Sequence, residues 1–199
     1  MRILVVGATG TIGKPVAEAL AARHEVVRAS RHGDFQVDTS SRESIERFFA
    51  AVGPFDALVS AAGSARFKPV QELTDEDFQF SLANKLMGQV NLVRFGLSTV
   101  REGGSFTLTS GILGPHPMPG SAAISLVNMG LEGFARATAL EKPRGIRVNV
   151  VSPPWVTETL VELGWDTAPG LPAADVAKAY VESVEGTRTG EVLDARDFA

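Results

Sequence analysis

The chain has 199 residues, of which 44% are hydrophobic and 21% are charged, and it carries a formal net charge of −4 with a pI near 5.4. This length predicts one domain, and the mildly acidic balance argues against a nucleic-acid partner, which usually requires a basic face. Cysteine is absent, which excludes a disulfide framework, a thiolate nucleophile and a thiolate metal site.

Strands and helices are expected to alternate along the chain. Aliphatic runs predict strands at residues 3–6, 25–29, 35–37, 56–60, 105–109, 146–151 and 191–193. Apolar residues at helical spacing predict helices at 10–22, 41–52, 74–100, 121–140 and 173–184. This alternation predicts a single-domain α/β fold over residues 1–199, with a doubly wound, Rossmann-like parallel sheet. The first apolar run is too short for a signal peptide or a membrane span, so we expect a cytoplasmic protein without a membrane partner.

A glycine-rich turn lies between the first predicted strand and the first predicted helix. Gly7 permits a tight turn, Gly10 lets backbone N–H groups approach a pyrophosphate, and Gly13 allows the helix to pack closely on the sheet. This context predicts dinucleotide binding, and the alternative is a turn whose glycines serve backbone geometry alone. The predicted cofactor contacts of the turn are Gly7, Thr9, Gly10, Thr11, Ile12 and Gly13.

The end of the second strand predicts which dinucleotide is bound. A carboxylate at this position would bind a ribose diol, but Ser30 stands there and Arg31 follows it. A guanidinium group suits a phosphate and a serine hydroxyl adds a donor, so the sequence favours NADP(H) over NAD(H). Arg28 and His32 are secondary candidates for the same phosphate, or else solvated loop residues.

Three segments resemble the short-chain dehydrogenase/reductase (SDR) family: GATGTIG at 7–13, GLEGFARATALE at 130–141 and IRVNVVSP at 146–153. The resemblance covers essentially the whole chain, with contractions after the second strand and in the substrate lid, which shortens to about residues 160–172. It is strongest to a small atypical subgroup of similar length that lacks the catalytic Tyr-x-x-x-Lys pair. The resemblance implies a nicotinamide cofactor and a small-molecule substrate. No metal-ligand spacing stands out in the sequence, so we expect no metal.

The resemblance places two unsuitable residues at the catalytic pair. The family tyrosine falls on Ile124 and the family lysine on Asn128, and neither side chain can relay a proton. The only tyrosine, Tyr180, lies too far downstream to be realigned. Two other family residues are retained: Ser110, which would hydrogen-bond a substrate carbonyl, and Asn84, whose carbonyl holds a water in the family relay.

Other candidate residues come from the chemistry or from the resemblance. His116 is an alternative proton donor because histidine titrates near neutral pH, although a loop histidine is more often a surface or packing residue. Lys85 is a helical lysine that points inward or, more commonly, into solvent. The remaining cofactor contacts implied by the resemblance are Asp38 at the adenine, Ala61, Ala62 and Gly63 at the ribose, and Pro153, Pro154, Trp155 and Val156 at the nicotinamide.

These residues leave three functions open. The first is an NADP(H)-dependent oxidoreductase acting on a small carbonyl or hydroxyl substrate, and the second is a catalytically silent NADP(H)-binding sensor or scaffold. The third is a non-redox isomerase or lyase that reuses the pocket, and retention of the glycine turn favours the first two. Family members associate through two long helices, so we expect a homodimer or homotetramer through the helices near 75–100 and 121–140.

Overall fold

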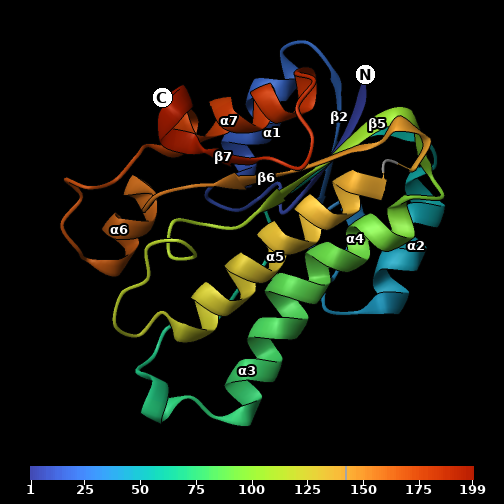
Figure 1. Cartoon of the computed structure of the whole chain (residues 1–199). Coiled ribbons are helices and arrows are strands. Elements are labelled where there is room, and N and C mark those ends of the chain that lie inside the picture. Colours follow the sequence, from blue (N-terminus) through green and yellow to red (C-terminus); the bar gives the residue numbers. More distant parts are fainter. Residues whose placement is uncertain (142) are drawn as a thin grey trace.

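A parallel sheet of seven strands forms the centre of the computed structural model, which describes residues 1–141 and 143–199 (Figure 1). The strand order β3-β2-β1-β4-β5-β6-β7 confirms the predicted doubly wound fold, because the order reverses between β1 and β4. The strands are β1 (Arg2–Val6), β2 (Glu25–Ser30), β3 (Phe35–Gln36), β4 (Phe55–Ser60), β5 (Val100–Thr109), β6 (Arg147–Ser152) and β7 (Val192–Asp194).

Helices cover both faces of the sheet (Figure 1). Helices α1 and α7 pack against each other on one face, and α2, α4 and α5 cover the other face. Within the described residues, no helix combines the length and the apolar character that crossing a bilayer requires. The helices are α1 (Gly13–Ala21), α2 (Arg42–Val52), α3 (Asp75–Ser81), α4 (Gly88–Gly96), α5 (Ala122–Glu141), α6 (Thr157–Leu163) and α7 (Ala173–Glu185).

Two apolar cores lie on opposite sides of the sheet. Leu4 and Val6 of β1 face the core under α2 and α4, whereas Ile3 and Val5 face the core under α1 and α7. Because both faces of the central strands are buried, these strands read as unbroken aliphatic runs rather than as alternating patterns. This explains why the sequence predicted them correctly.

The long helix predicted from Thr74 to Val100 is interrupted and ends earlier. Thr74 caps α3 through reciprocal hydrogen bonds with Asp77, as its sequence indicates. A π-helical segment, η2 (Leu82–Met87), then separates α3 from α4, and Val100 is already the first residue of β5. A π turn adds a residue to the helical repeat, so side chains on either side of η2 no longer follow one α-helical face.

Three other boundaries differ from the sequence prediction. Helix α1 begins at Gly13 rather than at residue 10, because the glycine turn occupies the preceding residues. Gly103-Gly104 lies inside β5 rather than before it, where the register with β4 is irregular and Gly103 has a φ of +71°. Helix α6 overlaps the start of the region expected to be only a short lid, so the lid is partly helical.

Candidate functional site

Two cavities lie at the carboxyl end of the strands and meet at Ala61–Gly63, the segment that follows β4. The turn cavity has a volume of about 340 Å³ and reaches from the glycine turn to the end of β2. The β5 cavity has a volume of about 240 Å³ and lies between the end of β5 and α5. Since Ala61, Ala62 and Gly63 line both, the cavities form one continuous depression at the switch point of the sheet.

The glycine turn leaves backbone donors free at the start of α1. Gly7 has a φ of +85°, and a Cβ there would lie 2.9 Å from the backbone of Ala61. A Cβ on Gly13 would lie 2.0 Å from the carbonyl oxygen of Gly7, so the helix approach also requires glycine. In the described part of the chain, the amides of Thr9, Thr11 and Ile12 make no backbone hydrogen bond. Free N–H groups at a helix N-terminus favour an anion such as a pyrophosphate.

The segments after β2 and β3 bring a cation and a carboxylate to the turn cavity. Ser30, Arg31 and Asp38 line it, whereas Arg28 and His32 line neither cavity. Asp38 accepts hydrogen bonds from the Ser40 hydroxyl at 2.7 Å and the Ser40 amide at 2.9 Å. These bonds, with a smaller contribution from the Arg31 charge, lower the pKa of Asp38 below its usual 3.8.

Ile124 and Asn128, which the sequence resemblance places at the family Tyr and Lys positions, both line the β5 cavity from α5. The Asn128 side chain is 1% exposed, and its Nδ2 donates to the carbonyl oxygen of Gly111 at 3.1 Å. Its Oδ1 has no hydrogen-bond partner among the described residues. A buried acceptor without a partner is costly, and a ligand donor in the cavity would satisfy it.

Ser110 lies at the end of β5 and lines the β5 cavity. Its hydroxyl donates to Glu132 Oε1 at 3.2 Å, and both residues are buried. Glu132 comes from α5 and also pairs with Arg136 at 3.5 Å. The hydroxyl of Ser110 is therefore oriented by a carboxylate in this structure.

Lys85 is the site residue that the sequence left open, and it points inward. It lines the β5 cavity from η2, and its Nζ donates to the carbonyl oxygen of Ser110 at 3.0 Å. Burial lowers the pKa of Lys85 from 10.5 to about 8. Its neighbour Asn84 lines the turn cavity instead, and the Asn84 amide donates to the Phe80 carbonyl of the same helix at 3.0 Å.

Two other titratable candidates lie outside the cavities. His116 is exposed in the loop after β5 and lines neither cavity. Tyr180 is fully buried in α7, where its hydroxyl lies 2.7 Å from Thr109 Oγ1. Burial raises the pKa of Tyr180 well above its usual range, so this phenol is a poor proton donor.

Trp155, which lines the β5 cavity, belongs to an aromatic cluster. The Trp155 ring lies 6.5 Å from the ring of Phe67 and 5.3 Å from the ring of Trp165. Pro153, Pro154, Trp155 and Val156 all line the cavity, as the resemblance implied for residues near the nicotinamide. The backbone carbonyl of Trp155 accepts a hydrogen bond from the Leu171 amide at 2.9 Å, which fixes the C-terminal end of the lid segment next to the site.

The fold and the joined cavities define a dinucleotide-binding α/β protein of the Rossmann type. A family model described as "Enoyl-(Acyl carrier protein) reductase" matches residues 2–189. An uncharacterized oxidoreductase from Schizosaccharomyces pombe is 30% identical over 182 residues, which cover 82% of this chain and 69% of that protein. The chain belongs to the short-chain dehydrogenase/reductase family.

Solved structures show the same similarity. The crystal structure of the protein lin1944 from Listeria innocua is 42% identical, with a TM-score of 0.94 and 98% of each chain covered. A small-chain dehydrogenase in complex with NADPH is 26% identical, with a TM-score of 0.86, and the match covers 98% of this chain and 95% of that one. The chain spans between about half and three quarters of the length of the curated relatives that it matches.

Proposed function

We propose that the protein is an NADP(H)-dependent oxidoreductase acting on a small carbonyl or hydroxyl substrate. The continuity of the two cavities through Ala61–Gly63 carries this proposal, because it joins a phosphate-binding turn to the pocket that holds Ser110. A bound dinucleotide would supply or accept the hydride, while the protein positions the reacting groups.

The turn cavity offers binding groups for the phosphates of the dinucleotide. The free amides at Thr9, Thr11 and Ile12 would bind the pyrophosphate. Arg31 is exposed and, among the described residues, forms no ion pair, so its guanidinium is available to a 2′-phosphate. The similar small-chain dehydrogenase in complex with NADPH supports the same preference.

The β5 cavity favours an apolar carbonyl compound as the substrate. Ile124, Leu113 and Trp155 give it apolar walls, and Trp155 also packs in the aromatic cluster. The same cavity is lined by Ser110 and Asn128, which contribute a hydroxyl group and the side-chain oxygen Oδ1. Such a pocket would bind an apolar body and orient one polar group.

Titration of the purified protein with NADPH and NADH, followed by nicotinamide fluorescence, tests the cofactor assignment. We expect tighter NADPH binding in the wild type. Arg31→Ala should weaken NADPH binding about 10-fold or more, because a hydrogen bond to a charged group contributes about 1.5–3 kcal/mol. NADH binding should stay unchanged, and Arg28→Ala, which lies outside the cavity, is the matched control. Absence of binding by either nucleotide would refute the proposal.

A catalytically silent NADP(H)-binding protein is the second candidate. It is favoured by Ile124 and Asn128, which line the pocket at the positions assigned to the family proton relay. Incubation of the NADPH complex with 4-nitrobenzaldehyde and acetophenone separates the two candidates. Oxidation of NADPH with formation of the alcohol supports the oxidoreductase, whereas stable NADPH with tight binding supports the silent protein.

A further inference from the structure

We infer that Lys85 is the proton donor of the β5 cavity, so that the ammonium group reaches the substrate oxygen from η2 rather than from α5. This inference rests on the proposed oxidoreductase function. It assigns the proton-transfer step to a side chain that the family pair does not include, and it gives the pocket the acid that Ile124 and Asn128 cannot provide.

The backbone around Lys85 places its side chain in the cavity. Lys85 lies within the π-helical segment, which connects α3 to α4. Its stem passes Gly63, where an added Cβ would lie 3.1 Å from the Lys85 Cα and 3.2 Å from its Cγ. Gly63 has a φ of +135° and lines both cavities, so a glycine opens the space through which Lys85 reaches the end of β5.

The ammonium group has unused donors. A lysine ammonium carries three N–H groups, and the Ser110 carbonyl accepts one of them at 3.0 Å. Within the described residues, Lys85 makes no other side-chain hydrogen bond and no ion pair. Lys85 is only partly exposed, so desolvation of an ammonium group with spare donors is costly, and a substrate oxygen in the cavity would accept one of them.

The nearby carboxylates are bound to groups other than the Lys85 ammonium. Glu132 of α5 faces the same end of β5, but its carboxylate is bonded to the Ser110 hydroxyl and paired with Arg136. Asp77 of α3 is paired with Lys68 and Arg66. Burial, rather than a charged partner, lowers the pKa of Lys85 to about 8, which is close enough to neutral pH for efficient proton transfer.

The proton balance of a reduction is complete with Lys85 as the acid. As the carbonyl carbon gains the hydride and its electron pair from the bound dinucleotide, a Lys85 Nζ–H bond breaks and an O–H bond forms on the substrate. The product is an alcohol and a neutral amine, which regains a proton from water. In the direction of oxidation, the neutral amine accepts the hydroxyl proton.

Competitive labelling of the apo-protein with a trace of acetic anhydride measures the protonation of Lys85 without requiring catalytic turnover. Mass spectrometry across a pH series gives the acetylation midpoint of each lysine, with Lys14 and Lys178 as exposed references. We expect the Lys85 acetylation midpoint near pH 8. A Lys85 midpoint equal to the references would overturn the inference.

Three variants test the role in catalysis. Lys85→Met should reduce kcat for 4-nitrobenzaldehyde by about 100-fold or more with little change in NADPH affinity. Lys85→Arg should be equally impaired, because a guanidinium retains its charge but does not release its proton. Lys178→Met, which removes an exposed lysine paired with Asp175, is the matched control.

The outcomes separate this inference from the proposed function. Wild-type turnover that Lys85→Met retains in full overturns the role of Lys85 and leaves the oxidoreductase intact. A wild-type protein that binds no NADPH, or that binds it and reduces no probe, contradicts both. Full activity in Lys85→Arg would also overturn proton donation, because only the charge would then matter.

Discussion

Lys85 and Asn128 donate to adjacent carbonyl oxygens at the end of β5. Lys85 Nζ binds the carbonyl of Ser110 at 3.0 Å, and Asn128 Nδ2 binds the carbonyl of Gly111 at 3.1 Å. The two side chains come from different elements, η2 and α5, and both line the β5 cavity. The cavity therefore has a cationic group on the η2 side and a neutral amide on the α5 side.

The pH dependence should follow the protonation of Lys85. Burial lowers the pKa of Lys85 to about 8, so the acid form predominates below that pH and the neutral amine above it. The rate of carbonyl reduction should therefore be level below about pH 8 and fall above it. The rate of alcohol oxidation should rise through the same pH. Initial rates in both directions across a pH series check this, and parallel profiles in the two directions would contradict it.

Lys85→Met should stabilise the protein while it lowers activity. The folded-state pKa of Lys85 lies below its usual value, so folding penalises the charged form at neutral pH. Removing the buried charge should raise the free energy of unfolding by about 0.5–2 kcal/mol at pH 7. Because the unfolded chain binds more protons between pH 8 and pH 10.5, this advantage should shrink as the pH rises through that window. Urea unfolding at several pH values measures the difference in free energy of unfolding between the variant and the wild type. A destabilised variant would contradict the prediction.

Restoring the family pair should compensate for the loss of Lys85. The double substitution Ile124→Tyr and Asn128→Lys places a phenol and an ammonium on the cavity wall that α5 already forms. In the Lys85→Met background, it should recover at least about 10-fold in kcat, because a tyrosine assisted by a lysine can act as a general acid. The single substitution Ile124→Tyr is the control. Equal activity in the single and double variants would contradict the expected cooperation.

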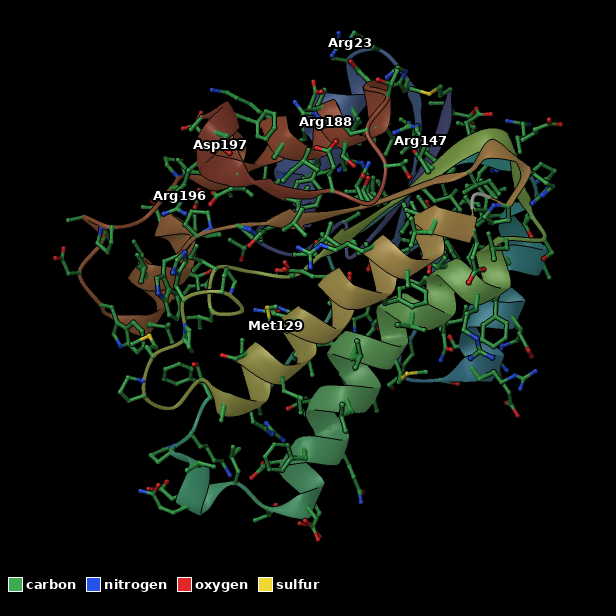
Figure 2. The ribbon with its side chains drawn as sticks, in the orientation of Figure 1. Arg23, Met129, Arg147, Arg188, Arg196 and Asp197 are labelled. Carbon is green, nitrogen blue, oxygen red and sulfur yellow. The ribbon has the colours of Figure 1, made fainter. Side chains whose placement is uncertain are left out.

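Arg147 should be important for stability rather than for activity. Its guanidinium donates to the carbonyls of Ser183 and Val184 at 2.9 Å, and to that of Arg188 at 3.2 Å, near the end of α7 (Figure 2). Arg147→Met should lower the free energy of unfolding by about 2–4 kcal/mol, because these carbonyls lose a charged donor.

The matched control for Arg147 is Arg42→Met, which removes an exposed ion pair with Glu46 and should change stability by less than about 1 kcal/mol. Chemical denaturation compares the two variants under the same conditions. An equal effect of both substitutions would contradict the prediction that the carbonyl contacts of Arg147 contribute more to the free energy of unfolding than an exposed ion pair does.

Self-association is predicted to use the outer face of α5. Leu126 is 51% exposed and Met129 is 44% exposed, and Figure 2 shows Met129 on this helix. Leu126→Glu should shift a homodimer or homotetramer towards the monomer in analytical ultracentrifugation, because it adds a charge to an apolar interface. Leu163→Glu, on exposed α6, is the control. A monomeric wild type would contradict the prediction.

Local sequence signals predicted most of the fold. Ser41 caps α2 by accepting from the Ser44 amide at 3.2 Å, and Thr74 caps α3, because capping depends on residues only three positions apart. The glycine turn could likewise be predicted, because Gly13 must avoid the Gly7 carbonyl within one strand–turn–helix unit, whereas the close approach of Gly7 to Ala61 depends on the distant β4. The length of β5 could not be predicted from the sequence, because its irregular register is set by pairing with the distant β4.

The orientation of Lys85 could not be read from the sequence. Helical periodicity assumes a constant repeat, and the π segment breaks that repeat between α3 and α4. The family resemblance indicated Asn84 as the site residue, whereas the adjacent Lys85 reaches the β5 cavity. His116 looked suitable by chemistry alone, but the loop after β5 holds it outside both cavities. Such placements depend on tertiary packing.

The position of Lys85 on η2 also bears on how this pocket can change over evolutionary time. If proton donation comes from η2, the side chains at 124 and 128 on α5 have only to shape the wall of the cavity. Substitutions there would alter which substrates fit without removing the acid. Related chains that retain a lysine at position 85 would then be free to diversify their specificity along α5, with the reaction chemistry held constant.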